Sequence, residues 1–189
     1  MFIKCTFQSR FMSAKQVWVM RDYQKCSGCR RCEIACSLYH EKKIWPEASR
    51  IRIFMLAPGL EVPHLCAQCH DYPCVESCPT KPKALSVDEK TGAVLVDSKL
   101  CISCRKCIEA CPGRVPFLHP ATRKSTICDL CNGDPQCVKA CRETGFNCLS
   151  LVQYEKGQGE ALYHRVYAKP PKNITEGLSK LIFGEKMEV

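Results

Sequence analysis

The sequence lacks the two kinds of segment that direct a protein into or across a membrane. It contains no run of about 18 apolar residues, the length that a membrane-spanning helix needs. Residues 1–20 hold Lys4, Arg10 and Lys15 without the apolar stretch of a signal peptide, and no pair of arginines precedes a hydrophobic segment. We therefore expect a soluble protein of a reducing cytoplasm, in a cell that lives anaerobically.

Fingerprints of common enzyme classes are also absent. The sequence contains no nucleophile with a placed base, no glycine-rich phosphate-binding loop and no nicotinamide or flavin motif. These absences argue against hydrolytic, nucleotide-dependent and flavin chemistry within the chain. We expect no catalytic residue of its own.

Cysteine, by contrast, is abundant, with 18 residues of this type. Sixteen of them form four groups, each with three closely spaced cysteines and a fourth that follows after three more residues. The groups are Cys26, Cys29, Cys32 and Cys36; Cys66, Cys69, Cys74 and Cys78; Cys101, Cys104, Cys107 and Cys111; and Cys128, Cys131, Cys137 and Cys141. The third group, C-x2-C-x2-C-x3-C-P, is the bacterial ferredoxin run, in which three thiolates hold one cubane iron-sulfur cluster and the fourth reaches another. The pattern predicts four 4Fe-4S clusters with these cysteines as iron ligands.

Several residues lie near this pattern without belonging to it. His64 precedes the second group and His70 lies in its Cys69–Cys74 gap, and we expect cysteines rather than histidines to hold the iron. His40, with Trp45, is expected to serve packing or partner contact. Cys5 and Cys148 are left over, and we expect both to be unligated, with Cys148 buried.

Two other uses of cysteine fit the pattern less well. The cysteine content approaches that of a disulfide scaffold, but the spacing is typical of metal sites and no secretory signal accompanies it. Zinc sites normally use two short cysteine pairs for each ion, whereas every group here has three closely spaced cysteines. A zinc-stabilised binding module is therefore the least favoured interpretation.

The formal net charge of +9 suggests a nucleic-acid partner. However, a cubane cluster with four thiolates carries a charge of about −2, so four clusters nearly cancel the excess. Many basic residues lie inside the cysteine groups, namely Arg30, Arg31, Arg105, Lys106, Lys139 and Arg142. We expect no nucleic-acid partner.

The elements predicted between the groups are short. We expect a strand through Val17 and Val19, a helix from Cys32, a strand over 51–55, a hairpin over 84–96 and short pairing segments near 115–118 and 126–127. Beyond residue 152 the chain has no cysteine, and Leu178, Leu181 and Ile182 predict a short amphipathic helix in an otherwise irregular extension. The fold class is α+β, with a core dominated by the clusters.

Residues 23–151 resemble the four-cluster, ferredoxin-like electron-transfer subunits of molybdenum and tungsten pterin oxidoreductases and related hydrogenase modules. The cysteine pattern alone allows neighbouring groups to pair, or outer groups to pair with outer and inner with inner. The resemblance implies the second, nested arrangement. It joins Cys26, Cys29 and Cys32 with Cys141; Cys128, Cys131 and Cys137 with Cys36; Cys66, Cys69 and Cys74 with Cys111; and Cys101, Cys104 and Cys107 with Cys78.

The nested arrangement divides the chain into two bacterial-ferredoxin-like units, each with two 4Fe-4S clusters. Residues 15–62 and 113–151 would form an outer domain, residues 63–112 an inner domain, and residues 152–189 a tail that docks on a partner.

The compact fourth group, the HEKKIWPEASRIRIF segment and the lack of a C-terminal membrane anchor look most like the small subunits of tungsten enzymes of the aldehyde oxidoreductase type, which include the tungsten-dependent class II benzoyl-CoA reductases. This resemblance implies a relay of single electrons between a larger tungsten or molybdenum pterin catalytic subunit and a second redox protein. The alternatives are a free polyferredoxin shuttle and the electron-transfer subunit of a hydrogenase or formate dehydrogenase.

Overall fold

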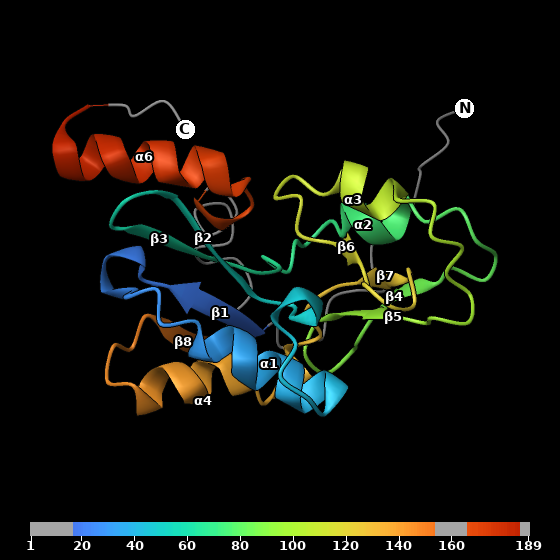
Figure 1. The fold of residues 1–189 in the computed structure, drawn as a ribbon. Helices are drawn as coiled ribbons and strands as arrows, with labels where there is room; N and C mark the ends of the chain where they lie inside the picture. Colours follow the sequence, from blue (N-terminus) through green and yellow to red (C-terminus); the bar gives the residue numbers. More distant parts are fainter. Residues whose placement is uncertain (1–16, 154–165, 186–189) are drawn as a thin grey trace.

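The computed structural model describes residues 17–153 and 166–185 of the chain (Figure 1). In these ranges the strands form four two-stranded antiparallel sheets. The strands are β1 (Val17–Arg21), β2 (Arg52–Ala57), β3 (Leu60–His64), β4 (Leu85–Val87), β5 (Val94–Val96), β6 (Phe117–Leu118), β7 (Ser125–Thr126) and β8 (Leu149–Gln153). The α-helices are α1 (Arg31–Glu41), α2 (Pro73–Glu76), α3 (Lys106–Ala110), α4 (Gln136–Glu143) and α6 (Pro171–Phe183), and the short 3-10 helices are η1 (Tyr23–Lys25), η2 (Pro46–Ala48) and η3 (Leu130–Gly133).

One group of elements joins the two ends of the cysteine-rich region (Figure 1). Strand β1 pairs with β8, and helix α1 packs against α4. The predicted helix from Cys32 is confirmed as α1, which ends where Lys42 adopts a left-handed conformation and its N–H bonds to Leu38 O. Because residues four apart lie on the same face of a helix, Cys32 and Cys36 both point inward from α1.

A second group holds the two middle cysteine groups, with α2 packed against α3 and beside β4. The predicted hairpin is confirmed, with Leu85 opposite Val96 and Val87 opposite Val94. Its turn is closed by the Asp88 carboxylate, which accepts hydrogen bonds from the N–H and the hydroxyl of Thr91. The predicted pairing segments are confirmed as β6 and β7.

Strands β2 and β3 form a hairpin on which α6 packs (Figure 1). The predicted strand over 51–55 is confirmed as β2, whereas its partner β3 was not predicted from the sequence. The predicted amphipathic helix is confirmed as α6. Its buried residues are Ile174, Thr175 and Ser179, and Leu181 and Ile182 in its last turn are 71% and 46% exposed.

The buried core mixes aliphatic side chains with thiols. Ile51, Leu65 and Leu130 are almost fully buried and belong to one cluster that also contains nine of the grouped cysteines and Cys148. Each cysteine in the described ranges is free of a disulfide, so the core there does not follow the disulfide-scaffold alternative. No helix in those ranges has the length and apolar character needed to cross a membrane.

Candidate iron-sulfur sites

The structure brings the grouped cysteines together in four sets of four, which we call sites I to IV. Each set takes three cysteines from one group and the last cysteine of another. Site I contains Cys26, Cys29, Cys32 and Cys141. Site II contains Cys66, Cys69, Cys74 and Cys111. Site III contains Cys101, Cys104, Cys107 and Cys78. Site IV contains Cys128, Cys131, Cys137 and Cys36, whose thiols interact electrostatically.

Helices α1 and α4 explain how the outer groups interlock. Cys32 and Cys36 lie one turn apart on α1, and Cys137 and Cys141 lie one turn apart on α4. Because the two helices pack against each other, each sends one thiol to site I and one to site IV. The thiols are therefore arranged as the nested pairing requires, with the outer groups sharing sites I and IV and the inner groups sharing sites II and III. Their role as iron ligands remains a prediction.

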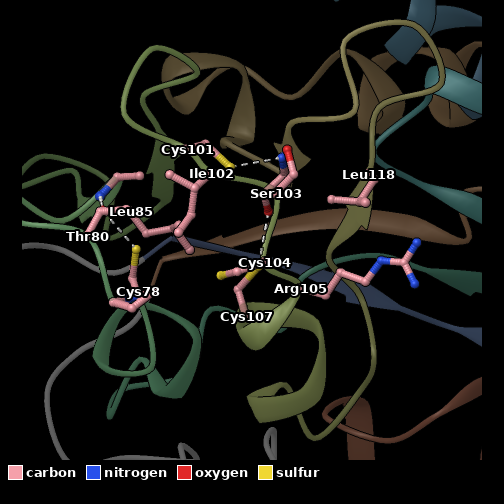
Figure 2. A pocket seen from close by; sticks show the side chains of 13 residues that line it. Cys78, Thr80, Leu85, Cys101, Ile102, Ser103, Cys104, Arg105, Cys107 and Leu118 are labelled. Atoms are coloured by element: carbon pink, nitrogen blue, oxygen red, sulfur yellow. Dashed lines mark hydrogen bonds between the residues drawn. The ribbon is translucent and has the colours of Figure 1, made fainter.

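Three of the sites are hollows that their own cysteines help to line. The hollows are partly open to solvent and span about 320 Å³ at site III, 410 Å³ at site II and 330 Å³ at site I. Figure 2 shows site III, where Cys78 faces the loop that carries Cys101 and Cys104. At site IV all four cysteines are buried. Four convergent thiols around unfilled space match the donor set that a cubane cluster requires.

The loops that present the thiols share an uncommon backbone conformation. The residue two positions after the first cysteine has a positive φ in every group, at Gly28, Gln68, Ser103 and Leu130. Only the first of these is glycine, although left-handed backbone is unfavourable for other residue types. Such a feature, repeated in four separate loops, points to a shared functional geometry.

Backbone amides point at several of the sulfur atoms. The N–H groups of Arg50, Ser125 and Leu149 lie 3.2, 3.4 and 3.4 Å from the sulfurs of Cys36, Cys101 and Cys141. At site II the N–H groups of Gln68 and Val115 lie 3.4 and 3.5 Å from Cys66 and Cys111. Hydrogen bonds of this kind stabilise negatively charged sulfur and tune a bound metal centre.

Several of the buried thiols resist ionisation when no metal is bound. Burial, together with neighbouring cysteines, raises the pKa of Cys69, Cys74 and Cys128 to about 12 and that of Cys131 to about 11. Four thiolates in one buried site therefore need positive charge between them. Iron ions supply that charge and hold their cysteine ligands deprotonated, so the residues of these sites fit a 4Fe-4S cluster.

Cys5 and Cys148 are the two cysteines outside the four groups. Cys148 is 3% exposed, as expected for a buried thiol, but it also lines the hollow of site I. A hydrogen bond between its thiol and that of Cys26 lowers the pKa of Cys26 and raises its own. This contact was not predicted from the sequence. Cys5 lies outside the described residues.

The histidines near the cysteine groups differ in burial and in their distance from sulfur. His64 is buried, its Nε2 lies 2.8 Å from Gly113 O, and burial lowers its pKa to about 4. His70 is exposed. The Nε2 atom of His40 lies 3.7 Å from Cys131 Sγ and 3.4 Å from Asp129 Oδ1, so this residue does more than pack. Trp45 stacks edge-on against His119, with ring centroids 5.2 Å apart.

Electrostatics near His40 are dominated by burial and one arginine. Burial lowers the pKa of His40 to about 4, which leaves the ring neutral at pH 7. Burial favours the neutral acid at Asp129, but the adjacent Arg50 guanidinium outweighs it, and the pKa of that carboxyl is lowered. Asp129 is therefore an ionised hydrogen-bond acceptor beside site IV.

Neighbouring sites are in electrostatic contact through particular thiols. Cys32 of site I interacts with Cys137 of site IV. Cys128 of site IV interacts with Cys66 of site II, and Cys74 of site II interacts with Cys107 of site III. The sites therefore follow one another in the order I, IV, II, III. Cys29 and Cys104, in the two end sites, are the exposed cysteines of the described ranges.

Comparison with known proteins is consistent with this geometry. Residues 59–152 match the family model described as the 4Fe-4S dicluster domain. The chain is 50% identical over 171 residues to the polyferredoxin-like subunit of aliphatic sulfonate oxidoreductase from Pyrococcus furiosus, covering 90% of this chain and 95% of that one. It is 32% identical over 145 residues to a subunit of polysulfide reductase from Wolinella succinogenes, covering 68% of this chain and 73% of that one.

A solved structure is also similar. The active site complex BamBC of benzoyl coenzyme A reductase contains a chain that is 24% identical, with 88% of this chain and 90% of that chain covered and a TM-score of 0.42. The relatives from Pyrococcus furiosus and Wolinella succinogenes are named as subunits of oxidoreductases. The protein belongs to the polyferredoxin-like family of 4Fe-4S electron-transfer subunits of oxidoreductase complexes.

Proposed function

We propose that sites I to IV each hold one 4Fe-4S cluster and that single electrons cross the protein in the order I, IV, II, III. A 4Fe-4S cluster supplies one-electron exchange with little change in its ligands. The observation that carries the proposal is the electrostatic interaction between thiols of consecutive sites, at Cys32 and Cys137, Cys128 and Cys66, and Cys74 and Cys107. The remaining residues exclude water from the interior sites and donate backbone N–H groups to sulfur.

The two end sites are where partners would exchange electrons. Cys29 at site I and Cys104 at site III are exposed, whereas all four cysteines of site IV are buried. Exposure of one ligand at each end shortens the distance to a docked protein. We infer that two different partners contact the chain, one near Cys29 and one near Cys104.

We infer that one partner is a larger catalytic subunit with a tungsten or molybdenum pterin cofactor, of the aldehyde oxidoreductase type. Identity of 50% over almost the whole of a subunit of an aliphatic sulfonate oxidoreductase favours a catalytic partner that acts on an organosulfonate. A benzoyl-CoA reductase partner is the second candidate, and it is supported by the resemblance of the compact fourth cysteine group. The complex is expected in the cytoplasm.

The domain division also remains a proposal. Residues 63–112 would form the inner domain around sites II and III, and residues 15–62 with 113–151 the outer domain around sites I and IV. Residues 152–189 would dock on a partner through the exposed end of α6. Ser125 lies in the outer range but contacts Cys107 of site III, so the two domains share a boundary there.

The test is anaerobic metal analysis of the protein isolated from its source with whatever accompanies it. About sixteen irons for each chain, the content of four cubanes, together with tungsten or molybdenum in a co-eluting large subunit, is the expected result. The same iron content without a second subunit would favour a free polyferredoxin shuttle. Zinc in place of iron would overturn the relay.

A further inference from the structure

Site IV contains a partly buried network of side chains in addition to its thiols. His40 on α1 has a side chain that is only 8% exposed, and its Nε2 lies 3.7 Å from Cys131 Sγ. The same nitrogen lies 3.4 Å from Asp129 Oδ1, and the other oxygen of that carboxylate pairs with Arg50. The ring nitrogen of His40 therefore faces a carboxylate and a sulfur atom at once.

The carboxylate determines which form His40 takes. Asp129 accepts hydrogen bonds from the Arg50 guanidinium and from the N–H of Cys131, the latter at 3.0 Å. Both donors make this carboxylate an acceptor, and a thiolate ligand can also only accept, so the ring nitrogen that faces both groups is assigned the proton. The Nε2–H group of His40 is thus a donor shared between Asp129 and the sulfur of Cys131.

We propose that His40 is a positioning residue for the cluster at site IV, where its N–H group donates to the Cys131 sulfur and raises the reduction potential of that cluster. This inference rests on the proposed function, because it requires a cluster at site IV. Reduction adds negative charge that is shared by the ligand sulfurs, and an N–H dipole directed at one of them stabilises the reduced form. The N–H of Arg50, 3.2 Å from Cys36 Sγ, acts in the same direction.

The hydrogen-bond donors near the cysteine sulfurs differ at sites II and III. At site II, Cys66 and Cys111 receive backbone N–H groups. At site III, Cys78 and Cys107 lie 3.4 and 3.2 Å from the hydroxyls of Thr80 and Ser125. The imidazole at site IV is a donor oriented by the partly buried ion pair of Arg50 and Asp129. Since site IV is second in the order, an electron that enters at site I would be stabilised there.

The experiment compares midpoint potentials in the full-length protein with its clusters bound, by redox titration followed with electron paramagnetic resonance. His40→Phe keeps a ring of similar size without the donor, and His40→Gln restores an N–H group. Cys36→Ser identifies the site IV signal by changing it. The matched control is His119→Phe, another buried histidine, which pairs with Glu41 and caps its own turn.

We expect His40→Phe to lower the site IV midpoint, His40→Gln to return it toward the original value, and His119→Phe to leave it in place. Unchanged iron content with an unmoved site IV midpoint in His40→Phe would overturn the proposal. If His40→Phe loses iron, pulsed resonance of the unmodified protein with ¹⁵N-labelled histidine decides. Coupling of that label to the site IV signal supports the contact, and its absence refutes it. Too little iron for four clusters in the unmodified protein would instead count against the proposed function.

Discussion

The hydroxyl of Ser125 lies 3.2 Å from the sulfur of Cys107, and the backbone N–H of Ser125 lies 3.4 Å from the sulfur of Cys101. One residue of the short strand β7 therefore contacts two cysteines of site III. The Ser125 side chain is buried beside the site III hollow. If Cys107 binds iron as proposed, its thiolate can only accept, and the hydroxyl would then donate to it.

Ser125→Ala is expected to lower the reduction potential of the cluster at site III without loss of iron. The backbone N–H contact to Cys101 remains, so only one donor is removed. The shift should be at most about 60 mV, the one-electron equivalent of ~1.4 kcal/mol. Redox titration followed by electron paramagnetic resonance measures it, with Ser150→Ala on the exposed face of β8 as control. A site III midpoint equal in the two variants would contradict a role for the hydroxyl.

Cys107→Ala and Cys148→Ala should differ in iron content, although both remove a buried thiol. Cys107 is a proposed ligand of site III, so its loss should remove about a quarter of the iron or convert that cluster to a smaller one. Cys148 contacts Cys26 but is not one of the four ligands proposed for site I, so Cys148→Ala should keep all the iron. Iron and sulfide analysis of the two purified variants provides the measurement. Equal iron content would show that the ligand assignment is wrong.

Glu33 links the first cysteine helix to strand β2. Its carboxylate accepts a hydrogen bond of 2.7 Å from the N–H of Ile53, and burial raises its pKa. Glu33→Ala leaves this buried N–H without its acceptor, which should lower the free energy of unfolding by about 1–3 kcal/mol. Glu33→Gln keeps an acceptor oxygen and should be affected less. Thermal bleaching of the cluster absorbance compares these variants, and Glu143→Ala on the exposed end of α4 should behave as the unmodified protein does.

The cysteine spacing predicted the four groups because each group is a local feature, with two cysteines in a tight loop and the third on the helix that follows. The hairpin of β4 and β5 was predicted for the same reason, since its alternation and its Thr91-Gly92 turn lie within a dozen or so residues. Pairing between distant groups came from family resemblance. It could not follow from spacing, because α1 and α4 meet only in the folded chain.

Other features left little or no signal in the sequence. Strand β3 contains Pro63 and Glu61, residue types that are disfavoured in strands, and its pairing with β2 overrides this preference. The left-handed residues Gln68, Ser103 and Leu130 are not glycines, so residue type gave no sign of their conformation. The contact of His40 with Cys131 joins residues 91 positions apart, and no local pattern encodes it.

Tyr167, which precedes α6, contacts Arg21 of strand β1. Its hydroxyl donates a hydrogen bond of 2.9 Å to Arg21 O, and the Arg21 guanidinium lies 4.8 Å from the centre of its ring. Arg21 in turn donates to the carbonyl groups of Leu65 and Cys66, at 3.0 and 3.1 Å, so the attachment reaches the loop of site II. Loss of the tyrosine hydroxyl should therefore loosen the C-terminal segment first.

Tyr167→Phe removes only that hydroxyl, which also accepts from the Arg21 N–H at 3.4 Å, and the cost of each buried hydrogen bond is about 0.5–1.5 kcal/mol. If the C-terminal segment opens independently of the cluster sites, this cost should raise its open population several-fold. Limited proteolysis under anaerobic conditions should then release the segment several-fold faster, while the iron content stays unchanged. Tyr39→Phe on α1 is the matched control, and it should leave the cleavage rate as it is. Equal cleavage rates in the two variants would mean that packing of α6 on β2 and β3, rather than the contact with Arg21, holds the segment in place.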